Sequence, residues 1–299
     1  MAVYKKTYRG YDGRLTPEWS RFLVLPRYTF EEMRASRFFT SFFLASFIMP
    51  LVCTLIIYLH HNFSALELMG LNADQILKID ADFFLFFLGF QSMLAFFLTA
   101  FVGPGLVSPD LADNALPLYL SRPFDRTGYV LGKFSVLAIL LSLMTWVPGL
   151  LLFLLQGYLE GAGWLGANLR IGAALFVGSW TWIFVLSLLV LALSATFKWK
   201  PVAGGLLFVI FFVGTGFGAV INQILRTRWG NLLSLSHLIG SAWLWLFGQP
   251  VETGAGSIFF RVLPGGEIPI TVIWITIGSV CLVCLRLLAT RIRGLEVVR

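Results

Sequence analysis

The residues best suited to chemistry in this chain are two adjacent histidines, His60 and His61, which follow a long apolar run. Asp74, Asp80 and Asp82 come shortly after them in the same polar segment. Imidazole and carboxylate groups bind metal ions and act as general bases, so a metal site or a catalytic site is one interpretation. Adjacent side chains point in different directions on regular structure, however, which favours the simpler interpretation of a polar segment between two apolar helices.

Two further motifs have the residue types for chemistry but the wrong surroundings or spacing. Cys281 and Cys284 form a Cys-x-x-Cys pair inside an apolar run, where small packing residues are a better interpretation than a redox pair. Residues 127–134 contain Gly132-Lys133, but they lack the leading glycine and the following Ser or Thr of a nucleotide-binding loop. We therefore expect no catalytic, cofactor-binding or metal site in this chain.

The composition predicts a protein whose solvent is largely lipid. The 299 residues are 58% hydrophobic and only 12% charged. Soluble domains carry about 25% charged residues, because charged groups are needed to cover a water-facing surface. The net charge of +7 is best explained by basic residues that flank membrane segments on one side. No basic and aromatic platform suggests a nucleic-acid partner.

Six uncharged runs in the sequence are each long enough to cross the hydrocarbon layer of a membrane as a helix. They contain no Asp, Glu, Lys, Arg or His. Charged groups within membrane helices usually mark proton relays or ion paths, so their absence argues against a proton pump, an ion-coupled transporter or a voltage sensor. The runs are residues 38–59, 83–107, 134–155, 171–196, 202–221 and 268–285.

The distribution of basic residues predicts which side of the membrane each loop faces. With the N-terminus inside, the inner segments carry 17 of the 22 Lys and Arg residues and the outer segments carry 5. Basic residues favour the cytoplasmic side, so both termini are expected to be cytoplasmic. A multi-pass protein of the bacterial inner (cytoplasmic) membrane is the expected localisation.

The segments around the six runs suggest a simple domain plan. Residues 1–37 are expected to form a cytoplasmic N-terminal interfacial segment, since aromatic residues and leucines alternate there with basic residues. Residues 29–32 match a capping box, which predicts a helix that starts at Thr29 and continues into the first run. Residues 38–285 form a single six-helix transmembrane domain, and residues 286–299 form a cytoplasmic basic tail.

The outer loop at residues 222–267 contains one more apolar stretch, at residues 231–248. Ser234, His237 and Ser241 fall on one helical face there, and large apolar residues fall on the other. We expect a helix that lies in the outer membrane interface or re-enters the membrane. A seventh span is the alternative, and it would place the basic C-terminal tail outside.

The inner loop at residues 108–133 is the most informative polar segment. Ser108, Pro109 and Asp110 have the residue types of a helix start. The apolar residues that follow are exposed to the cytoplasm unless a partner protein offers a groove or the helix lies on lipid headgroups. The loop's balanced charge favours a protein partner over anionic lipid. These apolar residues are Leu111, Leu116, Leu118, Tyr119 and Leu120.

The same loop resembles the first intracellular loop of ABC-2 type transporter permeases. The resemblance rests on Leu-Tyr-Leu-Ser-Arg-Pro at residues 118–123, on Arg126, and on Leu-Gly-Lys at residues 131–133. Residues 291–299 also look like the end of many such permeases, and the six-span plan agrees with the family over nearly the whole chain. Where family members often carry Gly-Thr-Leu-Glu, this chain has Asp-Asn-Ala-Leu-Pro at residues 113–117.

The resemblance implies an all-α membrane protein with six transmembrane helices, an N-terminal interfacial helix, an inner coupling helix, and an outer interfacial or re-entrant helix before the last span. It also implies an ABC ATPase subunit that binds ATP and Mg, and a second permease copy or a paralogue. The expected function is export of a lipid-like, amphipathic or polymeric substrate, and the alternatives are a membrane enzyme or a non-transporting scaffold. The residues expected to bind the ATPase are Asp110, Leu111, Asp113, Leu116, Leu118, Tyr119, Leu120, Arg122, Pro123 and Arg126.

Overall fold

A computed structural model describes residues 23–62, 78–113, 115, 126–250 and 268–292 of the chain. These residues are almost entirely helical, and no strand occurs among them. The helices of the first half are α1 (Val24–Ala35), α2 (Arg37–Ala45), α3 (Ile48–His60), α5 (Ala81–Val102), α6 (Pro104–Ala112), α8 (Arg126–Met144) and α9 (Trp146–Glu160). Those of the second half are α10 (Ala162–Ala167), α11 (Leu169–Thr196), α12 (Lys200–Phe208), η3 (Val209–Val213), α13 (Gly214–Leu225), η4 (Trp229–Leu233), α14 (Leu235–Phe247) and α15 (Ile270–Arg291).

The described part of the chain contains six helical segments that are long and apolar enough to cross a membrane. Each corresponds to one of the apolar runs of the sequence, so the prediction of six such helices is confirmed at this level. Several segments consist of two consecutive helices joined by a slight break. The segments are Arg37–His60, Ala81–Ala112, Arg126–Glu160, Leu169–Thr196, Lys200–Leu225 and Ile270–Arg291.

The fourth of these segments, α11, is the central helix of the bundle. It contacts α5, α6, α8, α9, α12, α14 and α15. Of its most apolar stretch, 72% is buried inside the protein, against 22% for the first, fifth and sixth segments. The outer surfaces of those three segments are rich in exposed leucine, isoleucine and phenylalanine, as expected of surfaces that face lipid or another membrane protein.

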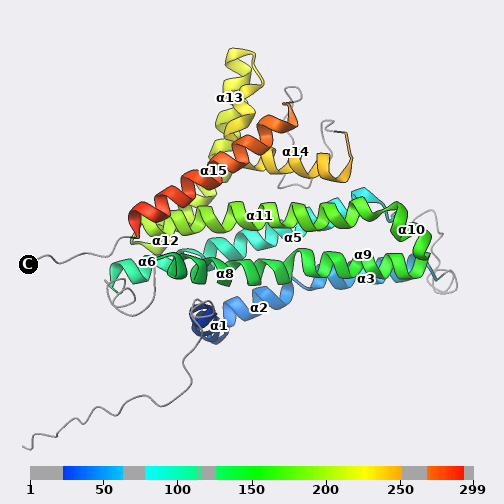
Figure 1. The fold of residues 1–299 in the computed structure, drawn as a ribbon, viewed down its shortest axis with the longest axis horizontal. Coiled ribbons are helices and arrows are strands. Elements are labelled where there is room, and N and C mark those ends of the chain that lie inside the picture. Colours follow the sequence, from blue (N-terminus) through cyan, green and yellow to red (C-terminus); the bar gives the residue numbers. More distant parts are fainter. Residues whose placement is uncertain (1–22, 63–77, 114, 116–125, 251–267, 293–299) are drawn as a thin grey trace, which may run out of the picture.

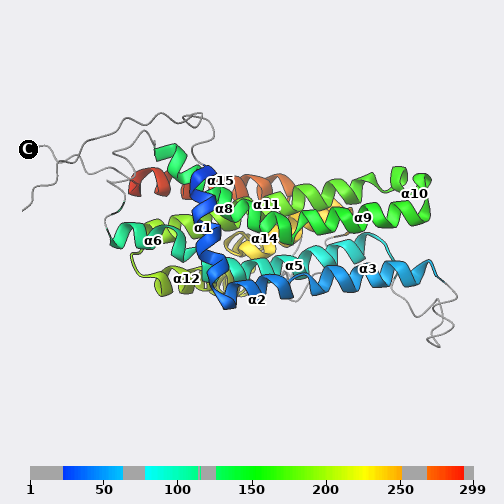
Figure 2. The same cartoon turned by 90° about the horizontal axis from the view of Figure 1, so that it is seen from below.

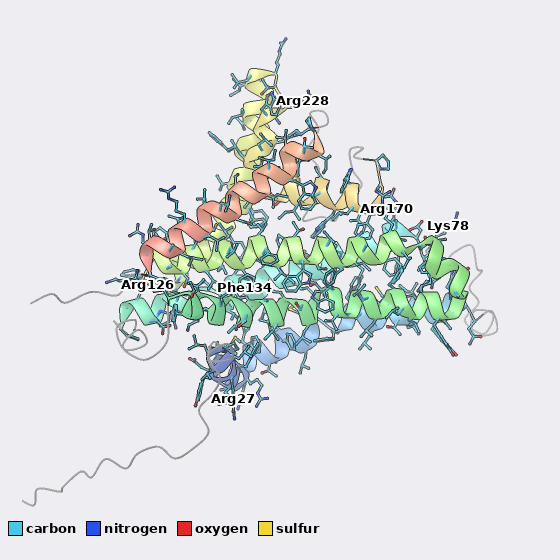
Figure 3. All side chains as sticks on the ribbon, in the orientation of Figure 1. Arg27, Lys78, Arg126, Phe134, Arg170 and Arg228 are labelled. Atoms are coloured by element: carbon cyan, nitrogen blue, oxygen red, sulfur yellow. The ribbon has the colours of Figure 1, made fainter. Side chains whose placement is uncertain are left out.

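The bundle has two distinct ends, which Figures 1 and 2 show at its left and right. At the end called here the loop end lie α6, the start of α8, α12 and the end of α15. At the opposite end, called here the α10 end, lie α10 and the ends of α3 and α9. Arg126 marks the loop end in Figure 3, and Lys78 and Arg170 lie toward the α10 end.

Helix α1 differs from the prediction for the N-terminal segment. The helix begins at Val24, five residues before the expected start, and the hydroxyl of Thr29 donates to the Leu25 carbonyl within it at 2.9 Å. Pro26 is preorganised for a first helical turn, which explains the earlier start. The helix also ends at Ala35 instead of continuing. Ser36 then caps α2 by accepting a hydrogen bond from the amide of Phe39.

The fifth segment bends away from the bundle in the middle of its length. A π-helical turn, η3, separates α12 from α13, and α13 projects away from the other helices in Figure 1. The following turn, η4, packs closely on α13. A β-carbon at Gly214 or Gly218 would collide with the carbonyl oxygens of Leu233 and Gly230 respectively, so these glycines permit the close approach.

Helix α14 lies at the expected position, but its surroundings differ from the prediction of an amphipathic helix. Ser234, His237 and Ser241 are all buried, because α14 packs against α5, α11 and α15. Trp243 is also buried and donates its indole N–H to the Gly178 carbonyl of α11 at 3.0 Å. At 13 residues, α14 falls short of the length needed to cross a membrane.

Arg170 anchors the C-terminal end of α14, and a buried histidine lies near its start. Arg170 of α11 donates from Nε to the Leu246 carbonyl at 3.0 Å and from Nη2 to the Trp245 carbonyl at 2.7 Å. These are carbonyls of the last helical turn, which carry partial negative charge and favour a cation. Burial lowers the pKa of His237 to about 4, so this imidazole is neutral at pH 7.

Candidate functional site

A buried ion pair joins the two helices that flank the inner loop. Asp110, in the last turn of α6, places Oδ2 3.0 Å from the ammonium nitrogen of Lys133 in α8. The Tyr129 hydroxyl donates to the same carboxylate oxygen at 2.6 Å. The ammonium also lies 5.6 Å from the centre of the Tyr129 ring. These three residues, called here the loop-base cluster, tie α6 to α8 on the two sides of residues 113–125.

The burial of the cluster makes its pairing necessary. Lys133 is 7% exposed and lies two turns inside α8, next to the Phe134 that is labelled in Figure 3. A buried ammonium without a counter-ion is strongly destabilised, because the protein interior solvates charge poorly. The Asp110 side chain, 16% exposed, supplies the compensating charge. The cluster therefore holds α6 and α8 at one defined spacing.

A second polar cluster joins α6 to the central helix α11. The Ser194 hydroxyl accepts from the amides of Val107 and Ser108 at 3.2 and 2.9 Å, and it lies 2.9 Å from the Pro104 carbonyl. The Ser108 hydroxyl lies 2.8 Å from the carbonyl of Phe197, which follows α11. Ser194 therefore bonds backbone groups in the first turns of α6 and joins this helix to α11.

This arrangement corrects the predicted helix start at Ser108. Helix α6 begins at Pro104, with the proline at its first position, and Ser108 and Pro109 lie inside it. The preceding Gly103, which has helical dihedral angles, permits a close contact with α11. A β-carbon at Gly103 would come within 2.8 Å of both methyl groups of Val190 in α11, so only glycine fits this close contact. The serine therefore serves as a contact to α11 and not as a cap.

The structure describes four of the ten residues predicted to bind a partner. Asp110 is engaged in the loop-base cluster, and Leu111 is partly buried against the hydrophobic core. Asp113 and Arg126 are exposed where the loop leaves α6 and enters α8. The other six lie outside the described residues: Leu116, Leu118, Tyr119, Leu120, Arg122 and Pro123.

Sequence reasoning counted Asp110 and Lys133 as separate charges and did not pair them. The available signal was the position of Lys133. This lysine lies at the edge of an apolar run, at the end of a loop that contains an acid. Ser194 gave no such signal, because a serine in an apolar helix is common and its partner lies 86 residues away. Neither cluster contains an activated nucleophile. Both clusters connect helices, so they contribute by holding those helices together.

In the described part of the histidine and aspartate segment, which does not include Asp74, the side chains of Asp80 and His61 bond helix residues. Asp80 caps α5 by accepting from the amides of Asp82 and Phe83 at 3.0 and 3.3 Å. His61 contacts Glu160 of α9, a residue that sequence reasoning did not consider. Over the described ranges, no three His, Cys, Asp or Glu side chains are grouped so as to hold a metal ion. Of the cysteine pair, Cys284 is buried in α15, and Cys281 is partly buried there.

No family model matches the chain, and no curated protein matches it significantly in sequence.

Proposed function

We propose that this protein is the membrane-spanning permease subunit of an ATP-driven transporter of the ABC-2 type, coupled to a separate ATPase subunit. One observation carries the proposal: α6, the helix that leads into the inner loop, is bonded through Asp110 and Lys133 to α8, the helix that follows the loop, and through Ser108 and Ser194 to α11. A loop anchored in this way transmits a displacement to three helices at once. The resemblance of the loop sequence to the coupling loop of such permeases supports the same conclusion.

The mechanism follows from the position of the loop in a chain that lacks a nucleotide-binding motif. The ATPase subunit would bind ATP and Mg, close, and push against the apolar residues at 111–120. The loop-base cluster would pass that displacement to α6 and α8, and Ser194 would pass it to α11. ATP can shift the permease between two conformational states only if the ATPase binds one of those states more tightly than the other.

Export of a lipid-like, amphipathic or polymeric substrate is the transport activity that we propose. The six apolar runs contain no charged side chain that could coordinate an ion or relay a proton. A second copy or a paralogue would complete the pathway about a two-fold axis. We place the loop end and both termini in the cytoplasm. Labelling of cysteines introduced at Gly254 and Arg299 from the two sides of the membrane tests this, and labelling of both from one side would reject it.

The decisive experiment asks whether the loop binds an ATPase. The tagged chain is purified from its native membrane, and the copurifying ATPase activity is measured for wild type, Leu116→Asp and Leu120→Asp. A carboxylate in an apolar groove should reduce copurified activity by at least about tenfold. Leu169→Asp, at an exposed leucine near the α10 end, is the matched control. Full ATPase recovery with both loop variants, or absence of any ATPase from the wild-type preparation, would reject the proposal.

A further inference from the structure

The first membrane segment is interrupted between α2 and α3, close to a proline. Ser46 and Phe47 form the turn between the two helices, and Pro50 lies in the first turn of α3. Proline has no N–H, so Pro50 cannot bond the carbonyl four residues earlier, which belongs to Ser46. Ser46 is buried, and a buried carbonyl without a donor is strongly disfavoured inside a membrane. The turn therefore needs a donor from another part of the bundle.

Gln91 of α5 supplies this donor. Its side-chain nitrogen, Nε2, donates to the Ser46 carbonyl at 3.0 Å across 45 residues of sequence, and both residues are buried. A carbonyl oxygen can only accept a hydrogen bond, so the nitrogen of the Gln91 amide, and not its oxygen, faces Ser46. A side chain of a neighbouring helix thus makes the bond that Pro50 cannot make.

The amide oxygen of Gln91 shows that this residue does more than fill space. This atom, Oε1, is buried and has no hydrogen-bond partner among the described residues. Burial of an unpartnered polar atom costs stability, and a leucine would fill a similar volume without that cost. The bond to Ser46 is the interaction that favours glutamine over an apolar residue at this position.

The turn contains a second bond of the same kind, made locally. The Phe47 amide bonds the Leu44 carbonyl, three residues earlier, at 3.1 Å. In a regular α-helix that amide would bond the carbonyl of Phe43. The Ser46 hydroxyl donates to the Phe43 carbonyl instead, at 2.6 Å. One displaced carbonyl is therefore satisfied within the segment, and the other is satisfied from α5.

Helix α3 has a narrow buried surface, so its direction depends strongly on this turn. Its buried residues form one stripe, which consists of Pro50, Cys53 and Ile57. The helix packs against α9 and α5. Helix α9 also starts beside this part of α5, because a β-carbon at Gly149 would lie 3.1 Å from the ring of Phe87, one turn before Gln91. The pair of α3 and α9 therefore starts beside one turn of α5, which bonds the base of α3 through Gln91.

We propose that Gln91 is a positioning residue for α3, which takes the place of the missing Pro50 amide and so fixes the angle at which the first membrane segment bends. With this bond in place, α3 leaves the turn in one direction and meets α9. When the bond is removed, the Ser46 carbonyl loses its donor, and the turn becomes a flexible joint. This inference does not depend on the proposed transport function.

The test measures both the bend of the segment and the stability of the protein. Spin labels are attached through clickable unnatural residues at the exposed Ser41 of α2 and Leu55 of α3, which leaves the native cysteines in place. These positions would be about 21 Å apart along a straight helix, a distance that pulsed electron paramagnetic resonance measures in nanodiscs. The wild type should give one narrow distance distribution. Gln91→Leu should broaden it and raise the unfolding equilibrium constant in detergent about tenfold, the effect of an unsatisfied buried carbonyl.

A second substitution separates the proposed role of Gln91 from simple packing. Pro50→Ala restores an amide that can bond the Ser46 carbonyl. In the Pro50→Ala background, Gln91→Leu should leave the distribution narrow and change the unfolding constant by less than about twofold. Ser92→Ala is the matched control, because Ser92 is equally buried on α5 and its hydroxyl has no partner in the described part of the chain. This control should leave both measurements close to those of the parent protein in both backgrounds.

The comparison of the two backgrounds decides the proposal. If Gln91→Leu alone does not fold, recovery of folded protein by the added Pro50→Ala supports the proposal. Equal effects of Gln91→Leu in the two backgrounds would overturn it, because the glutamine would then act through packing. An unchanged distance distribution for Gln91→Leu, or a double variant that also fails to fold, would overturn it as well.

Discussion

Replacement of Lys133 by methionine tests whether the loop-base cluster is a single energetic unit. The substitution removes the ammonium but keeps most of the apolar length of the side chain inside α8. Among the described residues, the Tyr129 hydroxyl at 2.6 Å then remains as a donor to the Asp110 carboxylate. Asp110→Asn is the reciprocal change, which keeps the shape of the acid and leaves the buried ammonium without a counter-charge.

The expected loss of stability follows from the burial of Asp110 and Lys133. Removal of one partner from a fully buried ion pair costs about 3–5 kcal/mol. Because the Asp110 side chain is 16% exposed, water can reach the carboxylate, and we expect about 2–3 kcal/mol for either single change. The double variant replaces both charges and leaves neither one unpaired. It should cost about 2 kcal/mol, which gives a coupling energy of about 3 kcal/mol.

The assay is the free energy of unfolding in detergent, measured for the wild type, both single variants and the double variant. Lys200→Met, at an exposed lysine at the same end of the bundle, is the control and should change stability by less than about 0.5 kcal/mol. Additive single effects would refute the reasoning, because they would mean that the two charges do not stabilise each other.

Three further predictions follow from the other polar contacts. Ser194→Ala removes the acceptor for two α6 amides, so the protein should lose about 1–2 kcal/mol in the same unfolding assay, and an unchanged stability would contradict the role of Ser194 in joining α6 to α11. Arg170→Gln should speed hydrogen exchange in the last turn of α14, measured by mass spectrometry, and unchanged exchange there would contradict the anchoring role. For His237, the folded pKa of about 4 lies below the unfolded value, so stability is full above about pH 6.5 and decreases as pH falls toward 4. Acidification from pH 7 to 4.5 should cost about 2–3 kcal/mol, and His237→Gln should remove that part of the pH dependence of the melting temperature.

Much of the helical plan could be predicted from the sequence because the membrane imposes a local rule. A segment that crosses lipid must satisfy its backbone hydrogen bonds within itself, so its length and composition are sufficient to find it. The helix starts were less predictable. Thr29 and Ser108 both have the residue types of a cap, yet each lies inside a helix, because Pro26 and Pro104 set the first turns earlier.

The candidate site could be predicted only as a segment, and its internal bonds could not. The position of the inner loop follows from the six apolar runs, and the residues of its two ends are visible in the sequence. The pairs Asp110 with Lys133 and Ser108 with Ser194 depend on how α6 packs against α8 and α11. No periodicity within one segment carries that information.

The sequence by itself determined the six membrane-length helices of this protein, because apolar length is a property of each segment alone. Only the tertiary structure decided which polar groups meet. The side of α14 that bears His237 faces protein and not water, because α5, α11 and α15 pack against this helix. His61 finds Glu160 across 99 residues because α3 and α9 end at the same end of the bundle. Contacts of this kind arise from the positions of whole helices, which are set by the packing of the entire core.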